Sequence, residues 1–243
     1  MADEDAAPTS EPAVPVPPAS APVPESDAAL ARRAQILATE HWGLLAARGT
    51  AQSEVLTRIT IFLTLVSAGL VTIGLLGQAT QFTGWFAAAA LSILGFLLVV
   101  GTLTQVRVFN VADEDMMFVV AMNRLRGGYV DLDPVVADYF LAATTDDMAG
   151  VQRTYSFLRR RTDASQVLGG SVFLIALVNA CVIGLLAGGI ATAAGGALWL
   201  AIVLGVLAGI TLLVVSVAIG YRGYRAAWES HVPRRTTTPT TRG

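Results

Sequence analysis

Few side chains in this sequence could carry out chemistry, and the largest group of them is the nine carboxylates of the charged segment 107–163. Two groups stand out there: Asp113-Glu114-Asp115, and the set Asp131, Asp133 and Asp138. Neighbouring acids on a helix point to different faces, the segment has no histidine, and neither spacing matches a calcium loop or a zinc site. We therefore expect these acids to lie on solvated helix faces and to pair with nearby arginines.

An enzyme is not expected from this sequence. It has no paired histidines or cysteines, no glycine-rich phosphate loop, and no acid or base inside its apolar stretches. Cys181 is the single cysteine, which excludes an intramolecular disulfide and argues against a metal site. Accordingly, neither a cofactor, nor a metal, nor a nucleic-acid partner is expected.

Four polar side chains inside the apolar stretches are the leading candidate site residues. Thr60, Thr64 and Ser67 follow i, i+4, i+7 spacing, which places three hydroxyls on one face of a helix. Asn179 is the most polar side chain of these stretches, and it must face protein or a wet cavity rather than lipid. Two uses of the hydroxyl face remain open: packing against another helix, or lining a narrow polar pathway.

Further candidates concern helix packing and the membrane surface. Small residues four positions apart let membrane helices approach closely. Two pairs have this spacing: Gly205 with Gly209, and Ser216 with Gly220. The run Arg159-Arg160-Arg161 is expected at the membrane surface, where anionic lipid head groups attract each arginine by about 1 kcal/mol.

These candidates depend on elements that cross a bilayer. The stretches 59–106 and 164–221 contain no Asp, Glu, Lys, Arg or His. Crossing about 30 Å of hydrocarbon takes about 20 apolar helical residues. Four segments reach that length: 59–77, 84–106, 167–188 and 195–220. The composition agrees, with 54% hydrophobic and only 14% charged residues. The sequence predicts an all-α polytopic membrane protein of two tandem units, each a helix followed by a transmembrane hairpin, with a cytoplasmic helical layer.

The basic residues indicate the orientation of the spans. All 16 are arginine, and none lies within the two uncharged stretches. They fall before the first span, between the hairpins and after the last span, whereas the short connections 78–83 and 189–194 hold none. The positive-inside rule therefore predicts that both termini and segment 107–163 are cytoplasmic.

The pattern divides the chain into six parts: a disordered, acidic, Pro/Ala-rich tail (1–27), an approach helix (28–58), a first hairpin (59–106), a cytoplasmic helical segment (107–163), a second hairpin (164–221), and a basic, Thr-rich tail (222–243). The first tail holds seven of the ten prolines and few large apolar groups, so it cannot bury enough surface to fold. Asp27 is the expected N-cap of the approach helix. The last part is expected to turn along the membrane surface and then to be disordered.

Segment 107–163 predicts two or three helices. The first continues out of the second span and stops at Gly127–Gly128. A short helix follows Asp133-Pro134, because aspartate caps and proline suits the first helical position. The last starts near Thr144–Thr145 and runs towards the third span.

A weak internal repeat relates the two halves. At an offset of 112 residues, an R-x-T-x-x-S-x-V-L pattern beginning at Arg48 recurs at Arg160. Both halves enter from the cytoplasm, so the repeat is parallel and implies a pseudo-two-fold axis along the membrane normal. The same offset places Ser67 over Asn179, which predicts that both lie at one depth in the centre of the bundle.

Two sequence features carry a resemblance. Glu40-His41-Trp42 before the first span and Met122-Asn123-Arg124-Leu125-Arg126 after the second resemble uncharacterised four-span integral membrane proteins of high-GC bacteria. That resemblance implies a multi-pass protein of the cell (inner) membrane and no activity. The approach helix and hairpin are also similar in outline to SLATT-type membrane effector modules, two-span proteins presumed to form pores.

Two functions follow as expectations. The first is a non-enzymatic membrane scaffold or regulator that acts through its cytoplasmic helices. The alternative is an oligomeric pore or channel-like effector lined by the hydroxyl face and Asn179. The expected partners are the lipid bilayer, anionic lipid head groups, further copies of the chain and a cytoplasmic protein. The scaffold is favoured because conducting pathways usually keep charged or strongly polar residues in their spans.

Overall fold

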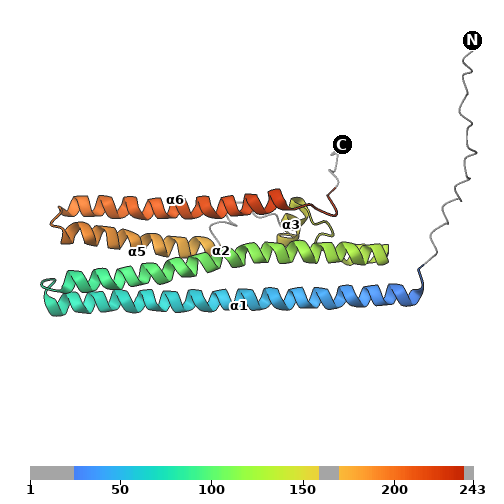
Figure 1. The fold of residues 1–243 in the computed structure, drawn as a ribbon, viewed down its shortest axis with the longest axis horizontal. Helices are drawn as coiled ribbons and strands as arrows, with labels where there is room; N and C mark the ends of the chain where they lie inside the picture. The colour runs from blue at the N-terminus through green and yellow to red at the C-terminus, as the bar shows by residue number, and fades with distance from the viewer. Residues whose placement is uncertain (1–24, 159–169, 238–243) are drawn as a thin grey trace, which may run out of the picture.

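The computed structural model describes residues 25–158 and 170–237. Its helices, in chain order, are α1 (Asp27–Thr80), α2 (Phe86–Leu132), the 3₁₀ helix η1 (Pro134–Tyr139), α3 (Met148–Tyr155), α5 (Ser171–Ala193) and α6 (Leu198–Ser230) (Figure 1). Helices α1, α2, α5 and α6 are each long and apolar enough to cross a membrane. The prediction of an all-α protein with four membrane-spanning helices is confirmed.

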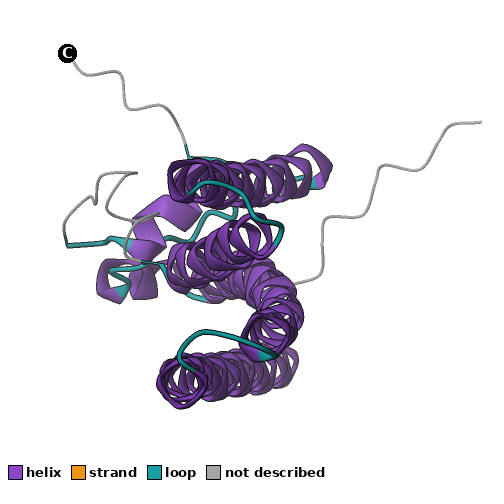
Figure 2. Cartoon of the chain, turned by 90° about the vertical axis from the view of Figure 1, so that its left-hand side faces the viewer, coloured by secondary structure: helices purple, strands orange, loops and turns teal. Residues whose placement is uncertain are grey.

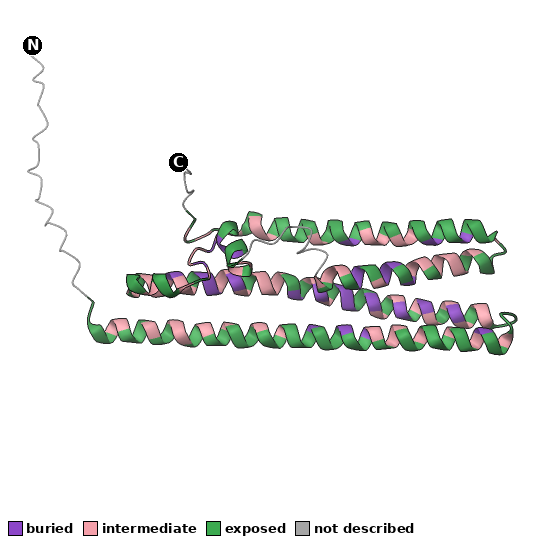
Figure 3. Ribbon diagram, turned by 180° about the vertical axis from the view of Figure 1, so that it is seen from behind, coloured by how far each residue is buried: buried purple, intermediate pink, exposed green. Residues whose placement is uncertain are grey.

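The four long helices lie side by side in a row rather than in a closed bundle. Helix α1 packs on α2, α2 on α5, and α5 on α6, whereas no comparable contact joins α1 to α6 (Figure 2). Buried residues therefore concentrate on α2, which has a long neighbour on each side (Figure 3). Helices α1 and α6, at the two edges of the row, each keep an uncovered side.

Helix α1 extends far beyond the membrane. It has 54 residues, about 80 Å at 1.5 Å per residue, whereas the hydrocarbon core takes about 30 Å. Its N-cap is Ser26, whose hydroxyl accepts a hydrogen bond from the Ala29 N–H, so the prediction of Asp27 is wrong by one residue. Asp27 lies in the first turn, where its charge favours the positive end of the helix.

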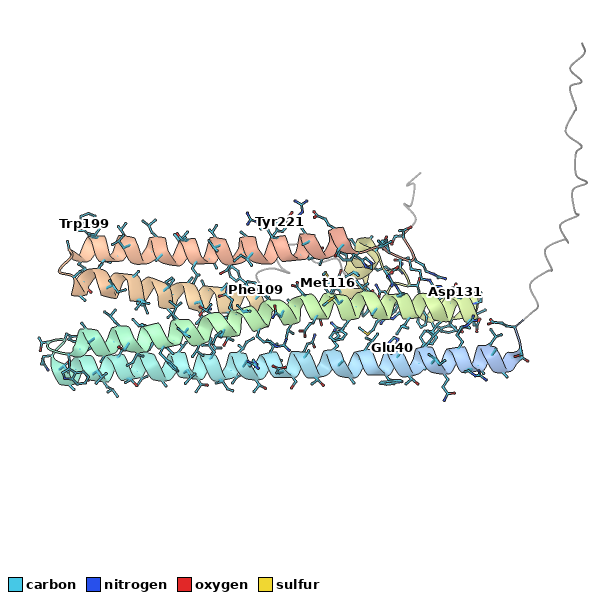
Figure 4. All side chains as sticks on the ribbon, in the orientation of Figure 1. Glu40, Phe109, Met116, Asp131, Trp199 and Tyr221 are labelled. Atoms are coloured by element: carbon cyan, nitrogen blue, oxygen red, sulfur yellow. The ribbon has the colours of Figure 1, made fainter. Side chains whose placement is uncertain are left out.

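Two aromatic residues mark the membrane thickness on α6. Trp199 and Tyr221 lie near opposite ends of its apolar part, and both side chains are exposed (Figure 4). They are about 33 Å apart along the helix axis, which matches the spacing of the aromatic belts that flank a bilayer core. Beyond Tyr221 the chain leaves the apolar region. We call the charged parts outside the spans, residues 27–58, 107–158 and 222–237, the extramembrane layer.

Helix α2 does not stop at Gly127–Gly128 as predicted but runs to Leu132. The glycines serve close packing instead. A Cβ atom on Gly127 would lie 2.8 Å from the carbonyl oxygen of Thr144, and one on Gly128 would lie 3.2 Å from the Leu37 side chain. The helix ends where Asp133 takes up an extended conformation and caps η1, whose predicted start is correct.

Three other predicted boundaries are corrected by the structure. Helix α3 starts at Met148, with Asp147 as N-cap, and ends at Tyr155 rather than continuing towards the third span. Helix α5 extends to Ala193, through most of the connection expected at 189–194. Helix α6 does not turn after Tyr221 but continues to Ser230, because Trp228 packs on the core cluster of Val119, Met122 and Val151.

Helices α5 and α6 approach each other through glycine. A Cβ atom on Gly205 would lie 2.6 Å from the Gly184 carbonyl oxygen, and one on Gly209 would lie 2.8 Å from that of Ala180. Backbone therefore packs on backbone, the contact that small residues allow between membrane helices.

A matched pair of substitutions tests this contact. Gly205→Ala forces the two helices apart, so we expect a loss of about 1–3 kcal/mol in the free energy of unfolding. Gly74→Ala is the control, since a Cβ atom on this α1 residue meets nothing within 4 Å. Thermal unfolding in detergent should show a lower midpoint for Gly205→Ala alone; equal midpoints would contradict the close approach.

Candidate functional site

Three polar side chains from three helices form a cluster in the half of the spans that lies nearer the extramembrane layer. The Asn179 amide of α5 donates a hydrogen bond to the Gln105 side-chain oxygen of α2 at 2.7 Å. The Gln105 amide donates in turn to the Ser216 hydroxyl of α6, also at 2.7 Å. All three residues are buried. This amide cluster, Gln105, Asn179 and Ser216, joins α2, α5 and α6.

The side-chain oxygen of Asn179 packs where α2 has a glycine, Gly101, and leaves no room for a larger residue there. A Cβ atom on Gly101 would lie 2.0 Å from Asn179 Oδ1 and 2.7 Å from the Phe62 ring. The oxygen therefore packs against the Gly101 backbone, and no described donor reaches it. The cluster holds no ionisable group, so it can position helices but cannot carry out acid–base chemistry.

The hydroxyls of Thr60, Thr64 and Ser67 lie on the side of α1 that faces away from α2. Each is exposed and donates a hydrogen bond to the carbonyl oxygen four residues earlier in its own helix, at 2.9, 2.9 and 3.0 Å. No helix in the described part of the chain covers this face. The alignment with Asn179 predicted that Ser67 lies at the centre of the bundle. In the structure Ser67 lies on the outer face of α1 instead. Whether the face contacts another copy stays a prediction.

The remaining predicted site residues separate by their contacts. Gly205 and Gly209 face α5, as described above. Ser216 belongs to the amide cluster, and a Cβ atom on Gly220 would lie 3.2 Å from the Phe109 ring of α2. Arg159, Arg160 and Arg161 lie outside the described residues, as does the second copy of the repeated pattern. Gln105 was missed as a site residue, although an amide at the end of a span was a usable signal.

The first acidic group lies at the junction of α1, α2 and α3. Asp115 accepts hydrogen bonds from Arg48 Nε at 2.6 Å, Gln52 Nε2 at 2.7 Å and the Tyr155 hydroxyl at 2.6 Å. Burial opposes its charge, but the bonds from Arg48 and Tyr155 prevail and hold the pKa of Asp115 below its usual value. Burial and the bond to Asp115 raise the pKa of Tyr155.

The predicted pairing of these acids with arginines is seen at two positions. Arg48 pairs with Asp115, and Arg107 pairs with Glu114 at 2.8 Å. Arg107 also reaches Glu54 of α1 at 3.1 Å, so the ion pairs join the two helices where they leave the membrane. Asp115 is nevertheless less solvated than expected, because Tyr155 and Gln52 cover it.

The most buried acid was not predicted as a site residue. Asp146, in the linker between η1 and α3, is fully buried. Its carboxylate accepts the backbone N–H groups of Arg234 at 3.0 Å and Arg235 at 2.7 Å, and Arg124 Nε of α2 at 2.8 Å. Burial would raise the pKa of Asp146, but these donors outweigh burial and hold the pKa below its usual value. The carboxylate is therefore charged at neutral pH and would lose these contacts only under acidic conditions.

The C-terminal segment 231–237 thus binds the linker, where a disordered tail was expected. The Asp146 N–H donates to the Arg235 carbonyl oxygen at 3.2 Å, and His231 Nε2 lies 2.8 Å from the Asp146 carbonyl oxygen. Thr237 donates to the Asp147 carboxylate through its N–H at 2.6 Å and its hydroxyl at 2.9 Å. We call the contact between 231–237 and Thr145–Asp147 the C-terminal clasp.

An apolar groove of about 440 Å³ borders the clasp. It lies in the extramembrane layer between α1, α2 and α6, and its lining includes Leu44, Met116, Val120 and Trp228. Arg124 and His231 of the clasp form part of its edge. Methionine side chains adapt to different apolar neighbours, and Met116 and Met117 both line this groove.

No metal centre is formed by the residues that the structure describes. Within 25–158 and 170–237, no group of three or more His, Cys, Asp or Glu side chains could hold a metal ion. Several carboxylates of the extramembrane layer, among them Glu54, Asp115 and Asp146, are instead paired with arginine.

One variant in α5 and a control variant in α1 test the amide cluster. Asn179→Leu leaves the Gln105 oxygen without its donor in an apolar setting, and we expect a loss of about 1–3 kcal/mol in the free energy of unfolding. Ser67→Ala is the control, because that hydroxyl bonds only to its own helix. Thermal unfolding and oligomeric state in detergent are the measurements; an Asn179→Leu chain as stable as the Ser67→Ala chain would exclude a structural role for the cluster.

Comparison with known proteins identifies no relative: no family model, curated protein or solved structure matches the chain.

Proposed function

We propose that this chain is a non-enzymatic integral membrane scaffold or regulator that acts through cytoplasmic helices. The observation that supports it is uncovered apolar surface in the extramembrane layer. Trp42 of α1 is 71% exposed, Tyr139 of η1 is 78% exposed, and Val135 and Leu141 beside it are 64% and 65% exposed. Exposed apolar groups clustered in water mark surfaces that bind other proteins.

Lipid does not account for these residues. Trp42 lies about 25 Å along α1 from Ile59, the first residue of the apolar stretch. Segment 134–141 follows the far end of α2, beyond the charged part of that helix (Figure 1). Exposed Leu and Val on the spans face hydrocarbon and need no protein partner, whereas Trp42 and Tyr139 would face water.

The uncovered face of α1 favours a second copy of the chain as one partner. Exposed small or uncharged residues follow one another along it at spacings of three or four: Trp42, Ala46, Gly49, Ser53, Thr57, Thr60, Thr64 and Ser67. This row has no charge and passes without a break from water into the membrane. A helix that packs along this row must also present an uncharged face from the water into the membrane. Helix α1 of a second copy, parallel to the first, presents such a face.

The orientation belongs to the same proposal. The arginines of the extramembrane layer support a cytoplasmic location for that layer, by the positive-inside rule. The turns 81–85 and 194–197 are then external, and a cell (inner) membrane is the setting. Arginines at the membrane surface, including Arg159, Arg160 and Arg161, would contact anionic lipid head groups.

Cysteine accessibility tests the orientation. In a Cys181→Ala background, a cysteine at Thr83 should react with a membrane-impermeant thiol reagent in intact cells. A cysteine at Asp138 should react only after the cells are opened, because η1 would be cytoplasmic. Both positions are exposed in the structure, so the reverse pattern would show the opposite topology.

Site-specific photo-crosslinking in cells tests the scaffold. A crosslinker at Trp42 should give an adduct of twice the chain mass, because this position would face a second α1. A crosslinker at Tyr139 should give a larger adduct with a different protein. Arg222, exposed at the membrane end of the extramembrane part of α6, is the control position. Absence of adducts at both Trp42 and Tyr139 would contradict the proposal.

An oligomeric pore is the second candidate, favoured by the open row of spans. Several copies in a ring could place the Thr60, Thr64 and Ser67 face around a shared lumen. Those hydroxyls already bond to their own helix, however, so lipid can cover the face without an unpaired donor. Planar-bilayer recording of the purified chain separates the two candidates, since a scaffold is silent and a pore gives reproducible conductance steps.

A further inference from the structure

The C-terminal clasp has the features of a peptide-binding site that already holds its ligand. Segment 231–237 contributes no helix or strand of its own and crosses the Thr145–Asp147 linker with a bend at Arg234 and Arg235. Two of the contacts to Asp146 come from main-chain N–H groups, and the Asp146 N–H donates back to the Arg235 carbonyl oxygen. Hydrogen bonds to the main chain of a bound segment contribute affinity with little dependence on its side chains.

Side chains add selectivity to that main-chain contact. Asp131 at the end of α2 pairs with the Arg235 guanidinium. Asp147 accepts both the N–H and the hydroxyl of Thr237, and Arg124 donates to the Val232 carbonyl oxygen at 3.3 Å. The site therefore suits a segment in which a basic residue precedes a hydroxyl residue by two positions.

The site is incomplete without its ligand. Asp146 is fully buried, and without segment 231–237 its carboxylate would keep only the Arg124 guanidinium as a described donor. Removal of the segment would uncover this carboxylate and replace its two main-chain donors with water. An empty clasp therefore favours either the return of its own segment or capture of another segment with the same groups.

We propose that the Thr145–Asp147 linker, with Arg124 and Asp131, is a binding site for a basic peptide, and that segment 231–237 occupies it as a ligand from the same chain. A peptide of that class from a partner protein binds by displacing the segment. The groove beside Arg124 and His231 offers apolar surface to a longer partner. This site is separate from the Trp42 and Tyr139 surfaces, so the inference does not rest on the scaffold proposal.

A disulfide can hold the segment in place and thereby test the proposal. The hydroxyl oxygens of Thr145 and Thr237 are 3.0 Å apart, so cysteines at both positions can reach disulfide geometry. In the full chain carrying Cys181→Ala, Thr145→Cys and Thr237→Cys, oxidation locks the segment and reduction frees it. The two states share one sequence and one preparation, so a folding defect cannot produce a difference in binding between them, and thermal unfolding of the oxidised chain shows that the variant is folded.

The probe is a fluorescent peptide of residues 231–237, with blocked ends, added to the purified chain in detergent. We expect anisotropy to show binding to the reduced chain and at least tenfold weaker binding to the oxidised chain. A peptide with Arg235→Pro lacks both the N–H that reaches Asp146 at 2.7 Å and the guanidinium that pairs with Asp131. It should bind the reduced chain at least about tenfold more weakly, since one hydrogen bond to a charged group is worth about that factor.

Two results would overturn the proposal. If the peptide binds neither state, the clasp is a fixed structural contact and not an exchangeable site. If it binds both states equally, or binds as well with Arg235→Pro, it is held elsewhere by its charge alone. The crosslinking experiment at Trp42 and Tyr139 is unaffected by either result, so failure here is distinguishable from failure of the scaffold proposal.

Discussion

The structure depends on one constraint, that hydrocarbon offers polar groups no partner. Helix formation satisfies the backbone, and the hydroxyls of Thr60, Thr64 and Ser67 satisfy themselves on their own helix. The longer amides of Gln105 and Asn179 instead bond to each other, and Gln105 reaches Ser216. That requirement ties α2, α5 and α6 together, while α1 joins the row by apolar packing, centred on Phe62 and Ile59.

Outside the membrane, charge takes over the same task. Arg48 with Asp115, and Arg107 with Glu54 and Glu114, hold α1 and α2 together after they leave the apolar region. These pairs are partly exposed, and such pairs contribute little individually. Asp146 differs because it is fully buried, so its donors are needed to offset the loss of solvation. Among the polar contacts of the extramembrane layer, we therefore expect loss of one donor to Asp146 in the clasp to lower the stability most.

The row arrangement gives the two proposals a common physical basis. Edge helix α1 keeps an uncharged face free for another copy, and edge helix α6 would have little contact with α2 in the extramembrane layer without the clasp and Trp228. The two hairpins are thus joined through α2 and α5 in the membrane and through the clasp outside it. Exchange of segment 231–237 for a partner peptide would loosen the second of these connections and leave the first unchanged.

Sequence alone determined the four spans, the long approach helix and the start of η1 at Asp133-Pro134, because hydrophobic length and capping are properties of neighbouring residues. Tertiary structure decided where α2 and α6 end. Helix α2 continues through Gly127 because the Thr144 backbone packs on that residue, and α6 continues past Tyr221 because Trp228 packs on a core cluster distant in sequence. It also decided that Ser67 faces outward while Asn179 is buried. Asp146 meets Arg234 and Arg235 only after the chain has crossed the membrane twice more, and contacts at such separation leave no local pattern to detect.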